Sequence, residues 1–173
     1  MKRLSTLFLA SMASLFVLTA CAQADKSKRP SPPATASATL ASGASISINY
    51  SQPALKGRTM GKDIEPMEGK VWRAGANEAT VFETSKDLNF GGQTLPAGKF
   101  GLFLLVEKEE AQFIFNKTWN QWGSGAYKSA DDVLRVKAKV GTSAEAMDRL
   151  TYQIKGNTIS LTWGNAQWSI AAQ

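Results

Sequence analysis

Glu78 is the carboxylate best placed to do chemistry in this sequence. It lies in the block 72–80, which reads Trp-Arg-Ala-Gly-Ala-Asn-Glu-Ala-Thr, and three further carboxylates precede that block, at Asp63, Glu65 and Glu68. If Glu78 and one of these faced each other across a cleft, the pair would suit acid–base hydrolysis of a glycan. The alternative is structural, with Glu78 in an ion pair with Arg73 that holds a loop against the fold. Charged pairs in loops are more often structural than catalytic, so Glu78 is a weak catalytic candidate and no residue is assigned as catalytic.

Aromatic rings and amides form a second group of candidate functional residues, in the loop stretches 51–77 and 116–130. Flat rings stack on sugar faces, amides hydrogen-bond to hydroxyl groups, and nearby cations, Lys62 among them, would suit an anionic glycan. The predicted binding residues are Lys56, Arg58, Trp72, Arg73, Asn77, Glu78, Asn116, Trp119, Asn120, Trp122 and Tyr127. In the alternative, the rings pack under the loops as a satellite core, which is common for large aromatic side chains in small domains.

The residue counts exclude several classes of enzyme. The sequence contains no histidine and a single cysteine, Cys21. Ser-His-Asp hydrolysis, Cys-His proteolysis and imidazole metal sites all require an imidazole, so those classes are ruled out. The glycine-rich motifs that bind nucleotide phosphates are missing from the sequence as well. We therefore expect no metal and no cofactor, and the spacing of aromatic and basic residues does not favour nucleic-acid binding.

The first 36 residues resemble the export and anchoring region of a bacterial lipoprotein. Lys2 and Arg3 precede an apolar core at residues 7–18, and the sequence Leu18-Thr19-Ala20-Cys21 follows. This order is typical of a signal peptide at residues 1–20 that ends at a lipobox, whose cysteine is acylated, for example with palmitate, and becomes the new N-terminus. Residues 21–36 are then the lipid-anchored cysteine and a flexible linker rich in Pro, Ser and Ala. The residue after Cys21 is not Asp. By resemblance to lipoproteins of two-membrane bacteria, this favours the outer membrane, with the domain facing the periplasm, if the host has two membranes.

The chain from residue 37 to residue 173 is predicted to form one all-β domain, because apolar residues alternate with period two and no long helical period appears. Strands are predicted at residues 45–50, 79–85, 99–106, 112–115, 133–140, 149–155 and 159–163, with a last strand around residues 168–170. Residues 99–106 are almost continuously apolar, which indicates a strand covered on both faces. Turns are predicted at Gly156-Asn157 and at Gly164-Asn165.

The expected architecture is an antiparallel β-sandwich or flattened barrel of about eight or nine strands that carries two long loops. The loops are residues 51–75 and 117–130, which are rich in Gly, Lys, Asn and Trp and do not alternate. Long loops on a rigid sheet frequently hold functional residues.

Several short motifs resemble DUF2911, a family of bacterial secreted proteins that is known only as a domain of unknown function. They are Tyr50-Ser51 with Pro53, Lys56-Gly57-Arg58, Val71-Trp72-Arg73, residues 75–80, Leu95-Pro96-Ala97-Gly98 and Asn120-Gln121-Trp122-Gly123 with Tyr127. The resemblance covers residues 37–170 and implies an exported, β-rich domain, without implying an activity. Residues 59–66 depart from the family pattern, because relatives often carry a bulky aromatic residue and a longer segment there.

Taken together, the sequence predicts a lipid-anchored protein of the cell envelope that binds without catalysis. The membrane is the expected partner through Cys21, and the expected ligand is a glycan, a peptide or another envelope protein bound by the two loops. The alternative function is a histidine-free hydrolase that uses Glu78 and a second carboxylate on an envelope glycan.

Overall fold

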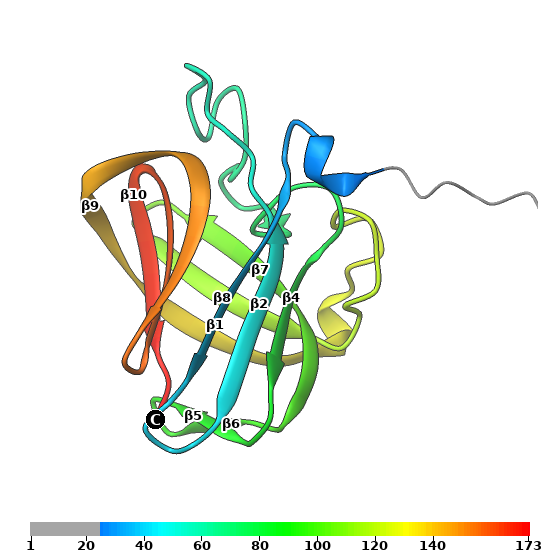
Figure 1. Ribbon diagram of the computed structural model, residues 1–173, viewed down its shortest axis with the longest axis vertical. Helices are drawn as coiled ribbons and strands as arrows, with labels where there is room; N and C mark the ends of the chain where they lie inside the picture. The colour runs from blue at the N-terminus through cyan, green and yellow to red at the C-terminus, as the bar shows by residue number, and fades with distance from the viewer. Residues whose placement is uncertain (1–24) are drawn as a thin grey trace, which may run out of the picture.

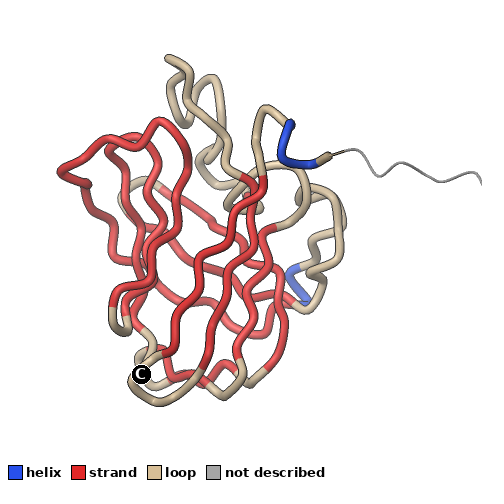
Figure 2. Tube along the Cα trace, viewed as in Figure 1, coloured by secondary structure: helices blue, strands red, loops and turns tan. Residues whose placement is uncertain are grey.

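The computed structural model describes residues 25–173. The predicted signal segment and Cys21 lie outside the described residues. The fold is built from ten antiparallel strands and two short 3-10 helices (Figures 1 and 2). The strands are β1 (Pro33–Thr39), β2 (Ser45–Ser51), β3 (Val71–Trp72), β4 (Thr80–Thr84), β5 (Leu88–Phe90), β6 (Gln93–Leu95), β7 (Gly98–Glu107), β8 (Glu110–Asn116), β9 (Asp132–Lys155) and β10 (Thr158–Ala171). The helices are Lys26–Lys28 and Ser129–Asp131.

One curled sheet makes up most of the molecule and forms a half-barrel. Its strand order is β1-β2-β4-β7-β8-β9-β10, β3 also pairs with β7, and β5 and β6 form a separate small hairpin. The long strand β9 pairs with β8 through its first part and with β10 through the rest, and the two strands arch over the concave side of the sheet (Figure 1). An isolated bridge between Ala54 and Arg149 then connects β9 to the chain that leaves β2. The all-β antiparallel prediction is confirmed, and the sheet curls as a flattened barrel would.

The concave side of the sheet encloses the main hydrophobic core. Alternation in β2 directs Ile46, Ile48 and Tyr50 inward, as the sequence predicted. Phe115 is at the centre of an aromatic cluster, with ring centroids 5.0 Å from Phe82 and 5.4 Å from Phe90. Close packing of this kind supplies most of the free energy that stabilises a small domain without disulfides.

A second, smaller core lies on the outer face of β7 and β8. It consists of Ala79, Phe103 and Ile114, with Tyr127 packed against it. Residues 117–130 therefore cover the convex face at this point. The prediction that residues 99–106 form a strand covered on both faces is confirmed, since β7 is buried from Phe100 to Leu104.

Two predictions about strand boundaries are wrong. The linker predicted for residues 21–36 ends earlier, because β1 begins at Pro33 and pairs with β2 in register. Its inward residues are alanines, which give only a weak apolar alternation in the sequence. The turn predicted at Gly164-Asn165 is a bulge inside the continuous strand β10, with Gly164 at φ +57°.

The part of the chain from residue 25 onward contains no helix long and apolar enough to span a membrane.

Candidate functional site

The block 73–79 interrupts a strand at the edge of β7 and builds the candidate site. Trp72 in β3 pairs with Leu104, and Thr80 in β4 pairs with Leu102. The two β7 partners, Leu102 and Leu104, are only two residues apart, yet seven residues separate Trp72 from Thr80. This excursion, named here the 73–79 loop, carries Arg73, Asn77 and Glu78 out of the sheet.

Buried side chains fix the backbone of the 73–79 loop. The carbonyl oxygen of Ala74 accepts hydrogen bonds from the hydroxyls of Thr80 and Tyr152, and that of Gly75 accepts one from the indole N–H of Trp72 at 3.0 Å. Gly75 fits closely against the strand, because a Cβ atom there would lie 2.7 Å from Oγ1 of Thr80. The loop is therefore a rigid support for its polar side chains.

Glu78 is paired with the N-terminal segment and not with Arg73, which corrects the ion pair predicted from the sequence. Its Oε1 lies 2.9 Å from Nζ of Lys26, and its Oε2 lies 2.9 Å from Nη1 of Arg29. Partial burial raises the pKa of Glu78, but hydrogen bonds from Lys26, its own backbone N–H and Arg29, together with the charge of Lys26, outweigh this and lower the pKa to about 2. Glu78 is therefore ionised at neutral pH.

The cavity beside Glu78 brings no second carboxylate to it. The cavity encloses about 180 Å³, and its lining residues are Lys26, Pro33, Asn49, Tyr50, Ser51, Glu78, Ala79 and Val81. The other carboxylates named from the sequence lie elsewhere, Glu65 in the pocket of Arg73 described below and Glu68 in a depression beside Trp168.

The loop 117–130 docks on the 73–79 loop through backbone hydrogen bonds. The N–H of Ala79 donates to the carbonyl of Gln121 at 3.0 Å, and the N–H of Gly123 donates to the carbonyl of Asn77 at 2.9 Å. Trp122 lies between these two bonds, in a β-bridge with Glu78. Its ring is 66% exposed, the most exposed large hydrophobic side chain among residues 25–173, and the guanidinium of Arg29 lies 6.0 Å from the ring centroid.

Asn116 and Tyr127 anchor the loop 117–130, with Asn116 fully buried and Tyr127 partly buried. Asn116 is fully buried and donates to the carbonyl of Lys128 and to Asp132, while its own side-chain oxygen accepts from the N–H of Thr118. Tyr127 packs on Phe103 and donates to Asp132 at 2.8 Å. Burial and the neighbouring Asp132 carboxylate raise the pKa of Tyr127 to about 12.

A polar pocket separate from the cavity of Glu78 is lined by the other part of the 73–79 loop, residues 73 and 75–77. It encloses about 280 Å³, and Trp72 and Trp163 form an apolar wall in which the two indoles stack. Its polar lining residues are Ser31, Arg58, Glu65, Arg73 and Asn77. We call it the Arg73 pocket. Trp72 is therefore a buried packing residue with an edge on the pocket, and not an exposed platform as predicted.

The remaining predicted residues are spread around this region. Trp119 is 37% exposed, with Nζ of Lys99 at 4.5 Å from its ring centroid, and Asn120 beside it is exposed. Arg58 donates to the carbonyls of Ala54 and Leu55, and Lys56 is exposed, with its backbone N–H donating to Asp148. The structure thus brings Arg58, Trp72, Arg73 and Asn77 together and places Glu78 and Trp122 beside them. Asn116 is buried away from this region, and Tyr127 is partly buried against Phe103.

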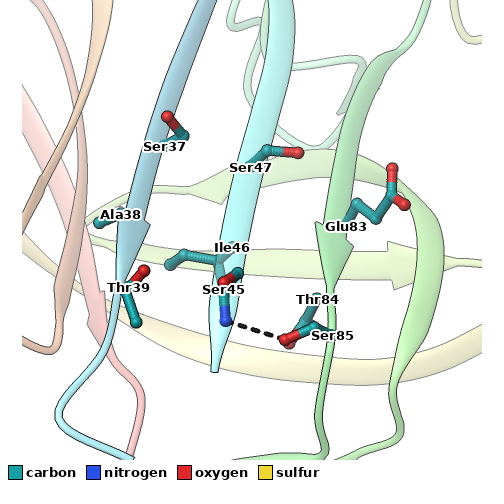
Figure 3. A pocket seen from close by; sticks show the side chains of 9 residues that line it. All are labelled: Ser37, Ala38, Thr39, Ser45, Ile46, Ser47, Glu83, Thr84 and Ser85. Atoms are coloured by element: carbon teal, nitrogen blue, oxygen red, sulfur yellow. Dashed lines mark hydrogen bonds between the residues drawn. The ribbon is translucent and has the colours of Figure 1, made fainter. Parts of the chain in front are cut away.

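A larger but shallower depression of about 450 Å³ crosses the ends of β1, β2 and β4 (Figure 3). Short hydroxyl side chains line most of it, and Glu83 is its one charged lining residue. Within it, the hydroxyl of Ser85 accepts from the backbone N–H of Ser45 at 2.9 Å, which links the strand ends. The lining holds no aromatic ring and no cation, so we place the candidate site at the 73–79 loop.

A family model described as "Protein of unknown function (DUF2911)" matches residues 31–172. The chain belongs to the DUF2911 family. The resemblance stated from the sequence is confirmed, and the matched range includes every strand of the fold. No curated protein and no solved structure matches the chain.

Four site residues of this DUF2911 domain were missed in the sequence. Lys26, Arg29 and Ser31 lie in the segment predicted to be a flexible linker, yet each contacts the 73–79 loop or its pocket. Trp163 alternates as a core residue does, and the local pattern carries no signal that its edge borders a pocket. The positive charge of Lys26, Lys28 and Arg29 is visible in the sequence, but no local pattern connects it to Glu78, 49 positions beyond Arg29.

Proposed function

We propose that this DUF2911 domain is a non-catalytic module that binds a glycan at the surface formed by the 73–79 loop and the loop 117–130. The supporting observation is Trp122, a large ring that is 66% exposed on a backbone held by hydrogen bonds on both sides. Leaving an indole in water costs free energy that burial would recover, so an exposed ring on a rigid loop favours a role in recognition.

The chemistry around Trp122 suits a sugar. The C–H groups on one face of a sugar ring pack well on the flat indole, and the surrounding polar groups provide hydrogen bonds for its hydroxyls. Asn120 is exposed two residues away, and the guanidinium of Arg29 adds positive charge next to the ring. A peptide or a protein could also pack on the Trp122 ring. Binding of a ligand of either class, in place of a glycan, is the alternative result of the binding assay.

The environment of Glu78 supports binding over hydrolysis. A general acid must hold a proton near neutral pH, whereas the pKa of Glu78 is about 2 because Lys26 and Arg29 bind its carboxylate. Paired-carboxylate hydrolysis also needs a second acid in the same cleft, and none lines the cavity of Glu78.

Location in the cell envelope is part of the same proposal and rests on residues 2–21, which lie outside the described residues. Acylation of Cys21 would tether the domain permanently, because several acyl chains partition strongly into lipid. We expect the wild-type chain in the membrane fraction and the Cys21→Ser variant in the soluble fraction. A membrane-bound Cys21→Ser chain would refute the lipid anchor.

The binding proposal is tested with the purified full-length chain on a glycan array and in pull-downs with envelope polysaccharides. We expect Trp122→Ala to weaken glycan binding about tenfold, equivalent to about 1.4 kcal/mol. The matched control is Val140→Ala, which truncates another exposed apolar residue far from the site. Equal binding by wild type and Trp122→Ala, or binding of peptides alone, would refute the proposal. Turnover of a polymer that Glu78→Gln abolishes would establish the hydrolase instead.

A further inference from the structure

Arg73 differs from every other arginine among residues 25–173. Arg29 and Arg135 donate to carboxylates, and Arg58 and Arg149 donate to backbone carbonyls. The guanidinium of Arg73 donates no hydrogen bond to any described group, has no carboxylate within 4 Å there, and its Nε is buried. A partly buried cation without a partner costs free energy, so its retention in the pocket calls for a compensating ligand.

The geometry of the guanidinium selects the ligand group. Arginine presents parallel N–H donors that match the two oxygens of a carboxylate. Arg58, in the same pocket, already uses Nε and Nη2 on the carbonyls of Leu55 and Ala54, whereas the guanidinium of Arg73 has all of its donors free among the described residues. With Glu65 also in the lining, the charged residues of the pocket sum to a single positive charge, which matches one carboxylate better than a doubly charged phosphate.

The size and walls of the pocket limit what carries this carboxylate. A volume of about 280 Å³ lies just below the usual range for drug-sized ligands, so the pocket holds one small group such as a single sugar unit. The buried indoles of Trp72 and Trp163 form the apolar wall behind the pocket, and Ser31 and Asn77 supply polar groups.

The Arg73 pocket lies next to the backbone of the residue that follows Trp122. A Cβ atom on Gly123 would lie 4.0 Å from Nη1 of Arg73, so the guanidinium reaches the residue that follows Trp122. From this placement we infer that the Arg73 pocket binds the carboxylate of an acidic sugar unit in a glycan that also packs on Trp122. The inference rests on the proposed glycan binding and names the ligand class.

A matched pair of small ligands tests the inference on the full-length chain. Methyl glucuronide and methyl glucoside differ only in a carboxylate in place of a hydroxymethyl group, and isothermal titration calorimetry or NMR titration measures their affinities. We expect the wild type to bind the glucuronide at least about tenfold more tightly, because charge-assisted hydrogen bonds are about twice as strong as neutral ones. Arg73→Gln should remove this preference, and Lys70→Gln, an equal charge change on an exposed side chain, should retain it.

Each other outcome refutes the inference. Equal affinity of the wild type for the two glycosides would show that Arg73 does not bind the carboxylate. A preference for the glucuronide that Arg73→Gln retains would show the same. Acetate that binds as tightly as the glucuronide would show that the sugar unit is not recognised. If Trp122→Ala weakens polysaccharide binding while Arg73→Gln leaves the acid preference intact, the proposed function stands and the inference fails. Melting temperatures of all variants confirm that they are folded.

Discussion

The hydroxyl of Tyr152 donates a hydrogen bond to the carbonyl oxygen of Ala74, 3.0 Å away and 78 positions earlier in the chain. Tyr152 lies in β9 and is buried, so this bond connects the arching strand to the 73–79 loop. The same carbonyl accepts a second bond from Thr80 at 3.1 Å. The loop that carries Arg73 and Glu78 is thus held from two sides of the barrel.

Removing the Tyr152 hydroxyl should destabilise the 73–79 loop, and the loss of stability should be larger when the Thr80 hydroxyl is also removed. Tyr152→Phe should lower the free energy of unfolding by about 1 kcal/mol, because the Ala74 carbonyl keeps its bond from Thr80. Tyr152→Phe combined with Thr80→Val leaves that buried carbonyl without either donor, so the double variant should lose more than the sum of the single losses. Chemical denaturation measures all three variants, and strictly additive losses would contradict the shared-acceptor arrangement.

A methyl group at Gly75 should disrupt the 73–79 loop. The added Cβ would meet Oγ1 of Thr80 at 2.7 Å and the carbonyl of Ser51 at 3.3 Å, and both belong to packed strands. Gly75→Ala should therefore cost about 1–3 kcal/mol of stability in a denaturant titration. Gly125→Ala is the control, because a Cβ atom at that position would enter open space with no neighbour within 4 Å, and it should be nearly neutral. Equal stability for the two variants would show that Gly75 is not closely packed.

Replacing Arg73 by an apolar side chain should not destabilise the fold. Burial lowers the pKa of Arg73, with the nearby Glu65 opposing this, which indicates that the charge is poorly compensated. Arg73→Met should leave the free energy of unfolding unchanged or raise it by up to about 1 kcal/mol. Arg149→Met, which removes bonds to the carbonyls of Pro30 and Gln52, should lower it instead. A clear decrease in the free energy of unfolding of Arg73→Met would contradict this prediction and show that Arg73 stabilises the fold.

Acid should release the N-terminal segment from the 73–79 loop. The folded pKa of Glu78 is about 2, below its ordinary value of 4.5, so the ion pairs with Lys26 and Arg29 stabilise the fold above pH 4.5. This contribution is lost as the pH falls from 4.5 towards 2. The Glu78 side chain is 40% exposed, so solvent screening limits its size to about 1 kcal/mol.

The predicted contribution of the Glu78 ion pairs is tested by measuring the free energy of unfolding between pH 7 and pH 2. Glu78→Gln should be less stable than wild type at pH 7, and the difference should shrink as the pH approaches 2. High salt at pH 7 should also reduce the difference, because salt screens ion pairs that solvent reaches. A difference between the two proteins that stays constant with pH would mean that the Glu78 carboxylate contributes no charge-dependent stability.

Local alternation of apolar residues was enough to predict the fold class and most strand positions. In β2 and β9, alternating side chains report which face of a strand is buried, and this signal is local. β1 gave a weaker signal because its inward residues are the small Ala34, Ala36 and Ala38. At Gly164 the sequence could not distinguish a turn from a bulge, because glycine allows the positive φ that both require.

The tertiary structure decided which residues meet at the site. Arg29 and Glu78 are 49 positions apart, and no local pattern predicts that this arginine, and not the nearby Arg73, binds the carboxylate. Trp72 and Trp122 both lie in stretches that the sequence predicts to be irregular, yet one is buried in β3 and the other is exposed, because burial there depends on how loops dock. The period of apolar residues reports which face of a single segment is buried. A binding site, in contrast, is formed by contacts between segments that are distant in the sequence.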